Sequence, residues 1–440
     1  MEARGTHRGV EVSSSAPDAL ALVLLAAHLL IALALRTVAW PEVTAPGHLW
    51  SRGWLMYRDI RFQHTPGTMG TLALGFAAFG PQAWFLRFYA IVWPLLAHFS
   101  LLRETRHARP IVRVLASAFF VTLLFGFEGN AVWPTVVMTA LAIPIAAELS
   151  RGRVVRAGLL IGIAILFKQT AAFVLLAAML TCAVRGRLRD AARMFLAASA
   201  PYALTLGVFF AFGAGVDMLR WTILVPLTVK PAGVDLFRPS AFQVFTLLSA
   251  FLPLLVETAL ERPGERERPY ARWLLVVAVG FTAIVYPDFT MLNAVAGVPC
   301  LALGAAKLME RRRFLVSVPA AAYAAVFVAA RGAGIAAGSE LDGKVLFWND
   351  DPAFNRVVDR LRETPPETRV YSELWGNLNA RADRLPPGRI YVHPWFDWFF
   401  SVDHTGERVA KAVQTPGTVI VGYRRGPRAS GVGPYALTAR

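Results

Sequence analysis

The sequence has very few cysteines, no nucleotide-binding glycine loop and no convincing internal repeat. Its two cysteines, Cys182 and Cys300, both fall inside apolar runs without metal-ligand spacing, so we expect neither a disulfide nor a cysteine-bound metal. The lack of a phosphate-binding glycine loop argues against transport driven by nucleotide hydrolysis. The lack of repeats argues against the transporter folds that are built from them.

Acidic residues are also scarce: 29 Asp and Glu stand against 45 Lys and Arg, a formal net charge of +16. In a soluble protein this balance would suggest a nucleic-acid partner. Here the basic residues lie in short blocks between apolar runs, as membrane topology produces, and we expect no nucleic acid. The positive-inside rule places in the cytoplasm the blocks Arg4–Arg8, Arg103–Arg113, Arg151–Arg156, Arg185–Arg193, Arg262–Arg272 and Lys307–Arg313.

Long hydrophobic runs, by contrast, are abundant. Hydrophobic residues make up 56% of the chain and the mean hydropathy is +0.48, whereas soluble domains are roughly 45–50% apolar. The first run, Ala19–Leu35, has no small-residue cleavage site after it, so we interpret it as an uncleaved span with a cytoplasmic N-terminus. The pattern predicts an all-α polytopic membrane protein with about eleven transmembrane helices, the last at Phe314–Ala330, together with interfacial or re-entrant helices.

Two segments do not fit single spans. Thr68–Phe79 is much shorter than the roughly twenty residues of a helical crossing, so we expect it to lie in the outer interface. Val154–Val184 has arginine blocks at both ends and Lys168 at its centre, where a lysine in mid-bilayer would be costly. We therefore predict two short helices that form a hairpin, with Lys168 at the outer tip.

From Ser339 onward the composition changes. Asp351–Glu363 predicts a helix that begins at Asp350 or Asp351, with Pro352 in its first turn. Three short β-type runs lie between Pro and Gly turns: Thr368–Tyr371, Arg389–Val392 and Thr418–Tyr423. We predict a multi-spanning domain over residues 1–338 and a small extracytoplasmic α/β domain over residues 339–440.

The polar loop Trp40–Gly67, between the first two apolar runs, has more charged and aromatic side chains than a simple connector needs. Its charged and titratable side chains include Glu42, Asp59, Arg58, Arg61 and His64. Carboxylates, cations and aromatic residues at a membrane edge indicate chemistry on a substrate held at the interface. His64 has no ligand companions at useful spacing, so we assign no metal site.

The predicted topology brings polar residues from distant parts of the chain to the same outer face. They are Glu42 with Asp59, Glu128, Lys168 with Gln169, and Tyr286 with Asp288. A carboxylate there can take the proton of an attacking hydroxyl. Lys168, with Arg58 or Arg61, can hold a phosphate through charge-assisted hydrogen bonds. The alternatives are that the acids are solvated and that the two arginines anchor at lipid head groups.

Several motifs resemble GT-C superfamily glycosyltransferases, integral membrane enzymes that use polyprenyl-phosphate sugars. Protein O-mannosyltransferases and the lipid A aminoarabinose transferase are examples. The segments that carry the resemblance are Pro41–Thr44, Gly53–Asp59, His64–Pro66, Phe79–Gly80 and Leu86–Arg87 in the first loop, then Gly158–Thr170, Tyr286–Pro299 and Asp359–Pro394. The resemblance covers most of the chain in order.

The resemblance implies roles for particular residues. In the family the catalytic base is an acid just after the first span, often within an Asp-Glu pair. Glu42 matches that position, but it follows Pro41 rather than an acid, so Asp59 remains a second candidate. Lys168 is similar to the family residue near the lipid phosphate. Asn293 stands where bacterial relatives often carry histidine, and receives no role.

The function implied is transfer of a hexosyl or pentosyl group from a polyprenyl-phosphate donor to a lipid, glycan or protein acceptor. The reaction is expected on the extracytoplasmic face of the plasma (bacterial inner) membrane, as part of cell-envelope chemistry. The departing lipid phosphate is a stable anion, so a single carboxylate base suffices and the displacement is inverting, unlike the two-carboxylate hydrolases. No cofactor is assigned; a divalent metal ion bridging acid and phosphate is left open.

The main alternative is a polytopic transporter or lipid flippase without glycosyl transfer. A third reading is a membrane scaffold whose outer domain binds cell-wall components.

Overall fold

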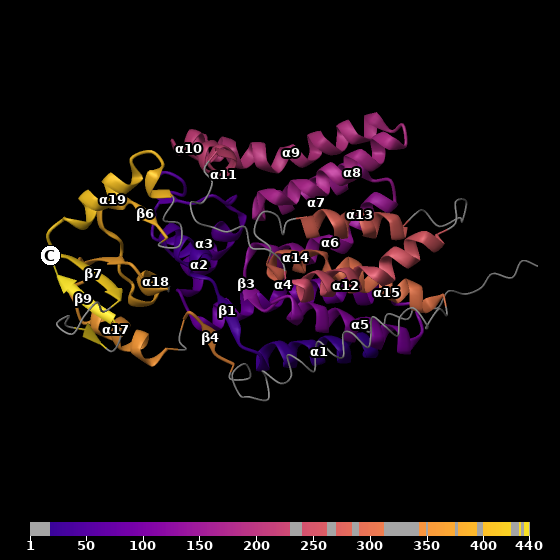
Figure 1. Cartoon of the computed structure of the whole chain (residues 1–440), viewed down its shortest axis with the longest axis horizontal. Helices are drawn as coiled ribbons and strands as arrows, with labels where there is room; N and C mark the ends of the chain where they lie inside the picture. Colours follow the sequence, from indigo (N-terminus) through magenta and orange to yellow (C-terminus); the bar gives the residue numbers. More distant parts are fainter. Residues whose placement is uncertain are drawn as a thin grey trace, which may run out of the picture.

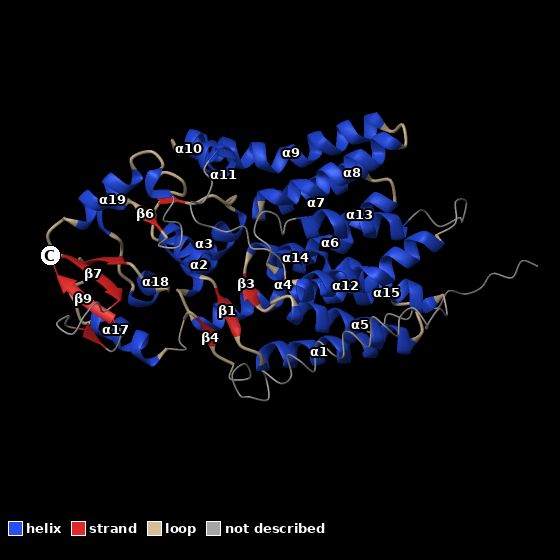
Figure 2. Cartoon of the chain, in the orientation of Figure 1, coloured by secondary structure: helices blue, strands red, loops and turns tan. Residues whose placement is uncertain are grey.

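The computed structural model describes residues 18–228, 240–261, 270–283, 290–311, 343–348, 351–374, 377–393, 399–423, 431–432 and 435–439. The predictions for Tyr286, Asp288 and the last span, residues 314–330, lie outside these residues. A bundle of helices along the long axis forms most of the molecule, and the C-terminal elements, orange to yellow, lie at one end of it (Figure 1). Strands occur only toward that end among the described residues (Figure 2).

The helices are α1 Ala19–Ala34, α2 Pro41–Ser51, α3 Gly67–Phe79, α4 Ala83–Glu104, α5 Pro110–Gly126, α6 Pro134–Ser150, α7 Val154–Phe167, α8 Ala172–Val184, α9 Leu188–Ala211, α10 Gly215–Leu219, α11 Val225–Thr228, α12 Ala241–Leu260, α13 Tyr270–Thr282, α14 Met291–Ala294, α15 Val298–Glu310, α17 Pro352–Arg362, α18 Leu378–Ala382 and α19 Thr405–Val413. Short 3₁₀ turns occupy Gln169–Ala171, Val295–Gly297 and Pro387–Arg389, and a π turn occupies Arg220–Leu224.

The strands are β1 Thr37–Ala39, β2 Ile60–Arg61, β3 Ala131–Val132, β4 Val345–Leu346, β5 Arg369–Ser372, β6 Tyr391–Val392, β7 Thr418–Tyr423, β8 Gly431–Val432 and β9 Tyr435–Ala439. They form three small sheets, with strand orders β3-β1-β4, β2-β6 and β5-β7-β9-β8. The pairings in the first two sheets are parallel: β1 pairs with β3 and with β4 of the C-terminal segment, and β2 pairs with β6 of that segment.

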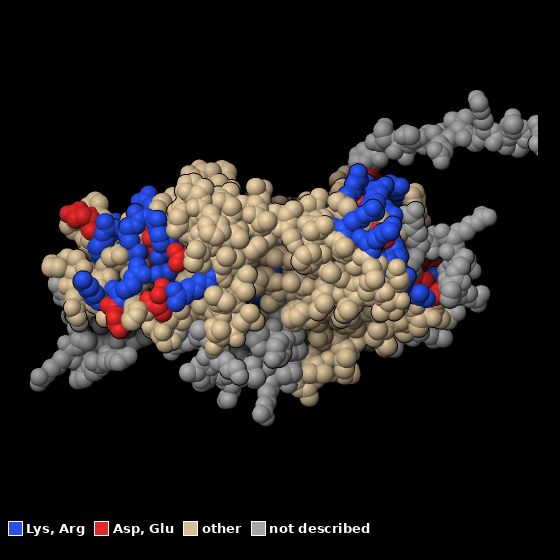
Figure 3. Space-filling model, turned by 90° about the horizontal axis from the view of Figure 1, so that it is seen from above, with Lys and Arg blue, Asp and Glu red and all other residues tan. Residues whose placement is uncertain are grey.

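The bundle presents a lipid-compatible surface. Four described helices are long and apolar enough to cross a membrane: Ala83–Glu104, Leu188–Ala211, Gln243–Leu260 and Met291–Glu310. Large apolar side chains such as Leu30, Val184, Leu196 and Leu204 are exposed on it, as expected where lipid replaces water. Figure 3 shows Lys and Arg concentrated at the two ends, with a broad band of uncharged residues between them. The chain is therefore an integral membrane protein.

The described basic blocks gather at the bundle end away from the C-terminal elements. Contacts between blocks or with the start of α1 join Arg113 to Asp18, Arg151 to Glu104, Arg109 to the carbonyl oxygen of Met309, and Arg185 to the ring of Trp273. This grouping agrees with the sequence prediction that the blocks share one side of the membrane.

The helix break predicted at Lys168 is present. The first helix, α7, ends at Phe167; Lys168 is extended, with φ −152° and ψ 122°, and α8 begins at Ala172. Gly158 and Gly162 allow α7 to pack closely on α9, since a Cβ at Gly158 would lie 2.5 Å from the carbonyl oxygen of Met194. Lys168 therefore lies at the end of two short helices, as the hairpin predicts.

The loop between the first two apolar runs, residues 40–67, is folded rather than open. Pro41 at the first position starts α2, which packs against α3, the short helix that the sequence places in the interface. The loop shares a hydrophobic core with the C-terminal segment, in which Tyr57, Ile60 and Phe62 join Phe399 and Val409. We call this region, formed by residues 37–67 and the C-terminal residues packed on them, the junction.

The C-terminal elements match their predicted types. Asp351 caps α17 by accepting a hydrogen bond from the Ala353 amide at 2.7 Å, and Pro352 occupies the first turn. The β-type runs become β5, β6 and β7. A small core of its own lies between α17 and the β5–β7 pair.

Candidate functional site

Glu42 lies in the first turn of α2, inside the junction. It is 5% exposed, and the N-terminus of the helix favours a negative charge at this place. Burial, followed by the charge of Glu42, raises the pKa of Tyr391 in β6 above its usual range. A carboxylate from the first loop therefore acts electrostatically on a phenol from the C-terminal segment.

Asp59, the second candidate base, is held by three donors. Its carboxylate accepts hydrogen bonds from the Leu55 amide at 2.9 Å, from Arg58 Nε at 3.3 Å and from Arg389 Nη2 at 2.9 Å. Burial would raise the pKa of Asp59, but these bonds outweigh it and the pKa is lowered from 3.8. Its backbone carbonyl accepts from the Tyr391 amide at 2.8 Å, so Asp59 fastens the loop to β6.

Asn377 fastens the start of α2 from the other side. This fully buried amide donates to the carbonyl oxygens of Ala39 at 3.1 Å and Phe347 at 2.9 Å, and accepts from the Thr44 hydroxyl. Because Thr44 follows Glu42 by two residues, a C-terminal side chain sets the position of the helix turn that carries the acid.

Lys168 is buried, 5% exposed, at the break between α7 and α8. Its ammonium donates to Asn293 Oδ1 at 2.7 Å and lies 5.7 Å from the ring centre of Trp133. Trp133 Nε1 donates to the same amide oxygen at 3.3 Å. The helix break at Lys168 and the helical turn Met291–Ala294 thus place a cation and its orienting amide together.

The end of the first loop rests on this helix break. Gln169 Nε2 donates to the Gln63 carbonyl at 2.7 Å, and the Thr65 hydroxyl donates to the Ile165 carbonyl at 2.7 Å. Gly67 is required here, because a Cβ on it would lie 2.5 Å from the Leu166 carbonyl oxygen. The loop therefore closes directly onto the C-terminal end of α7.

His64 lies between the loop and Lys168. Its ring contacts those of Phe62 and Trp133, with centroids 5.1 and 6.2 Å away. Burial, and then the nearby Lys168 charge, lower the pKa of His64 to about 3, so the ring is neutral. The side chain completes an aromatic wall beside the ammonium.

A pair of tryptophans connects the acid and the cation. Trp40, the N-cap residue of α2 just before Glu42, meets Trp133 edge to face with centroids 6.0 Å apart. Lys168 lies over the same Trp133 ring. The structure thus brings Glu42, His64 and Lys168 to one end of the bundle.

The two arginines of the first loop, Arg58 and Arg61, pair with aspartates. Arg61 is 3% exposed; it donates to the Tyr57 carbonyl at 2.6 Å and lies 3.9 Å from Asp217 and 4.0 Å from Asp403. Its guanidinium stacks over Trp221 at 5.5 Å. The side chain of Arg58 is 49% exposed and pairs with Asp59.

One further predicted site residue is among the described residues. Glu128 is half-buried in the turn before β3, with a positive φ of 61°. Tyr286 and Asp288 are not described. Among the described residues, no three His, Cys, Asp or Glu side chains form a metal-binding group.

Sequence reasoning did not assign Asn293, Trp133, Tyr391 or Asn377 to the site. Asn293 had a usable signal, because an amide inside an apolar, helix-breaking segment needs a partner. Trp133 looked like an ordinary interfacial tryptophan. Tyr391 and Asn377 enter only through the folding of the C-terminal segment onto the loop.

No family model matches the chain and no curated protein matches it. Two similar solved structures are those of ArnT from Cupriavidus metallidurans. The apo form has a TM-score of 0.58 at 14% identity and covers 91% of this chain and 92% of that chain. The form bound to undecaprenyl phosphate has a TM-score of 0.59 at 14% identity and covers 96% and 98%. The chain therefore has the GT-C fold of ArnT along almost its whole length, as its sequence motifs predict.

Proposed function

We propose that the chain transfers a sugar from a polyprenyl-phosphate donor to an acceptor hydroxyl on the extracytoplasmic side of the membrane. The observation that carries the proposal is the placement of Glu42 and Lys168 at one end of the bundle, joined through Trp40 and Trp133. The basic blocks lie at the other end, so the positive-inside rule makes the Glu42 end extracytoplasmic. The fold is shared with a protein whose structure holds undecaprenyl phosphate.

In this mechanism Glu42 takes the proton of the acceptor hydroxyl as its oxygen attacks the anomeric carbon. The bond from that carbon to the phosphate oxygen breaks, and its electron pair leaves with the lipid phosphate. The anomeric configuration is inverted. Lys168, oriented by Asn293, stabilises the charge on the departing phosphate.

Glu42 is preferred over Asp59 as the base. Asp59 accepts three hydrogen bonds and its pKa is lowered, which weakens it as a proton acceptor. Arg61 is committed to Asp217, Asp403 and Trp221, so we assign it a structural role in the junction. Gln169 and His64 shape the wall around Lys168.

The test uses purified protein with a panel of polyprenyl-phosphate sugars and measures release of free lipid phosphate. We expect release with the wild type and with Glu367→Gln, an exposed matched control, and release about 10²–10⁴-fold slower with Glu42→Gln. No release from any donor, combined with movement of intact donor lipid across vesicle membranes, would replace the proposal by the flippase alternative.

A further inference from the structure

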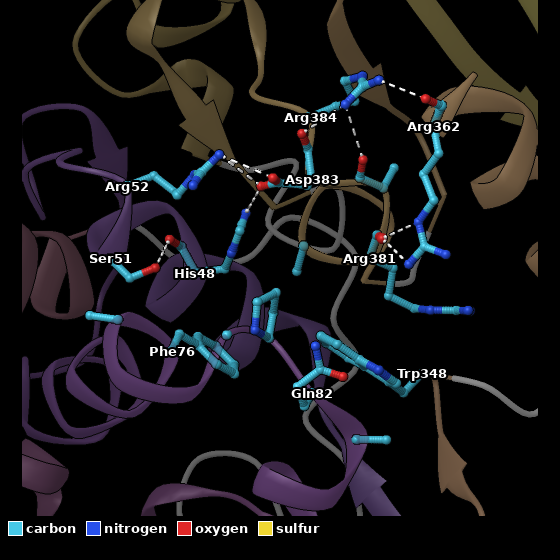
Figure 4. A pocket seen from close by; sticks show the side chains of 16 residues that line it. His48, Ser51, Arg52, Phe76, Gln82, Trp348, Arg362, Arg381, Asp383 and Arg384 are labelled. Atoms are coloured by element: carbon cyan, nitrogen blue, oxygen red, sulfur yellow. Dashed lines mark hydrogen bonds and ion pairs between the residues drawn. The ribbon is translucent and has the colours of Figure 1, made fainter. Parts of the chain in front are cut away.

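Arginines line two cavities, one at each end of the bundle. In the first, a cavity of about 650 Å³ in the junction, the guanidinium groups are bonded to their neighbours (Figure 4). The pairs are Arg52 with Asp383, Arg362 with Asp359 and the Arg381 carbonyl, Arg381 with Asn355, and Arg384 with the carbonyl oxygens of Arg362 and Thr364. These arginines therefore hold the fold together.

The second cavity, of about 560 Å³, lies at the end of the bundle that holds the basic blocks. Its walls come from the C-terminal parts of α4 and α6 and from the start of α7. Helix α6 packs against both of the other helices, and its small side chains Pro144 and Ala147 leave room in the wall. The volume falls within the roughly 300–1,000 Å³ typical of small-ligand sites.

The lining of this second cavity has more cations than anions. Its charged residues are Arg103, Arg151, Arg153, Arg156, Glu104 and Glu148. Arg151 Nη2 lies 3.7 Å from Glu104 Oε1 and Arg151 Nη1 lies 3.1 Å from Glu148 Oε1. Arg153 Nη1 lies 3.5 Å from the same Glu148 oxygen. The lining therefore has a formal excess of two positive charges, and both of its carboxylates already have arginine partners.

The other two guanidinium groups of the lining, those of Arg103 and Arg156, differ from this set. Within the described part of the chain, neither has an ion pair or a side-chain hydrogen bond, and both side chains are exposed. One comes from α4 and the other from α7, so two cations without partners stand in the wall of one cavity. A guanidinium in this state can donate to the oxygens of a phosphate without first breaking an ion pair.

Exposed apolar side chains lead up to each of these arginines. On α4, Leu96 and Phe99 are exposed and lie seven and four positions before Arg103. On α7, the exposed Leu159 follows Arg156 by three positions and itself lines the cavity. Residues at these spacings share one face of a helix. Both helices therefore present a lipid-facing surface that ends in a cation, which fits an amphiphile with an anionic head group.

We propose that this second cavity binds the head group of an anionic phospholipid from the leaflet at this end of the bundle, which the positive-inside rule makes the cytoplasmic one. Arg103 and Arg156 donate to the phosphate oxygens, and the acyl chains lie along the exposed faces of α4 and α7. The proposed site lies at the opposite end of the bundle from Glu42 and Lys168 and does not require sugar transfer.

The test measures lipid binding to the purified full chain by calorimetry in a non-ionic detergent, without sugar donor. The probes are dihexanoyl phosphatidylglycerol, dihexanoyl phosphatidylcholine and inorganic phosphate. We expect phosphatidylglycerol to bind at least about tenfold more tightly than either of the other two. Equal affinity for the two lipids would overturn the proposal, and inorganic phosphate that binds as tightly as phosphatidylglycerol would overturn the lipid assignment.

Variants locate the bound lipid. Arg103→Gln and Arg156→Gln remove cations that have no partner within the described part of the chain, so each should fold normally and bind phosphatidylglycerol about tenfold more weakly. Arg189→Gln makes the same change at an exposed position outside the lining and should leave affinity within about twofold.

Lys168→Ala separates this site from the proposed donor site and should also keep the affinity for phosphatidylglycerol within about twofold. Loss of the preference for phosphatidylglycerol in Lys168→Ala, or unchanged affinity in Arg103→Gln and Arg156→Gln, would overturn the proposal.

Discussion

At the scale of single residues, the different environments of the two candidate bases predict different effects of substitution on turnover and stability. Glu42→Gln keeps the shape of the side chain but removes the proton acceptor, so we expect turnover to fall by about 10²–10⁴-fold while donor binding stays. Asp59→Asn weakens bonds to Arg58 and Arg389, so we expect a lower unfolding midpoint and smaller loss of turnover. Steady-state kinetics beside thermal unfolding measure both. A dead, stably folded Asp59→Asn with an active Glu42→Gln would exchange the roles.

The role proposed for Lys168 predicts how its substitution changes the affinity for the donor. Lys168→Ala removes the cation proposed for the lipid phosphate, worth about 1.5–3 kcal/mol as a charge-assisted hydrogen bond, or roughly ten- to a hundredfold in donor KM. Asn293→Ala keeps the charge and removes its orienting acceptor, so a smaller rise is expected. Donor titrations at saturating acceptor measure the effect. An unchanged KM in Lys168→Ala would reduce the residue to a structural partner of Asn293.

At the scale of elements, the α7–α8 hairpin can be tested by cysteine labelling. Gly152 and Gly186 have φ near +70°, so cysteine would be strained there, and the exposed Arg156 and Arg189 are better positions. Both native cysteines are buried. We expect an impermeant thiol reagent to reach Gln82→Cys from outside intact cells but not Arg156→Cys or Arg189→Cys. Outside labelling of position 156 would reverse the proposed orientation.

The stability of the junction should decrease in acid, because histidines are buried there in the neutral form. The pKa values of His48 and His64 are lowered from 6.5 to about 4 and about 3, mainly by burial; Arg52 and Lys168 lower them further, while Asp383 and Gln169 oppose the shift. The unfolded chain therefore takes up protons near pH 6.5 and the folded chain does not. The contribution of these neutral histidines to the free energy of unfolding is complete above pH 6.5 and is lost as the pH falls below 6.5.

We accordingly expect the thermal unfolding midpoint to fall between pH 6.5 and pH 4.5. His64→Gln removes one of the titrating groups and should make the decline shallower. Differential scanning fluorimetry in a pH series measures both. A wild-type midpoint that is independent of pH across this interval would contradict buried neutral histidines in the junction.

At the scale of the whole molecule, the C-terminal segment is part of the first loop's support. It supplies β4 to β1, β6 to β2, Asn377 to the start of α2, and Arg389 to Asp59. Deletion of residues 339–440 should therefore remove donor binding and transfer together, instead of affecting acceptor recognition alone. Limited proteolysis of residues 40–67 and donor titration measure the outcome. A truncated protein that binds donor normally would show that the loop folds without this support.

The sequence by itself determined the membrane class, the shared end of the basic blocks, the helix break at Lys168 and a cap of α17 at Asp350 or Asp351. Each of these follows from local information: hydropathy runs, charge spacing and capping residues. The sequence also identified Glu42 and Lys168 as candidate site residues, because charged residues beside apolar runs can be recognised in the linear sequence.

Only the tertiary structure decided which partners these residues have. Lys168 meets Asn293, 125 positions away; Thr44 meets Asn377, 333 positions away; and Asp59 meets Arg389, 330 positions away. Such contacts depend on how whole helices and strands pack. Hydrophobic periodicity indicates which face of an element is buried, but it does not indicate which other element covers that face.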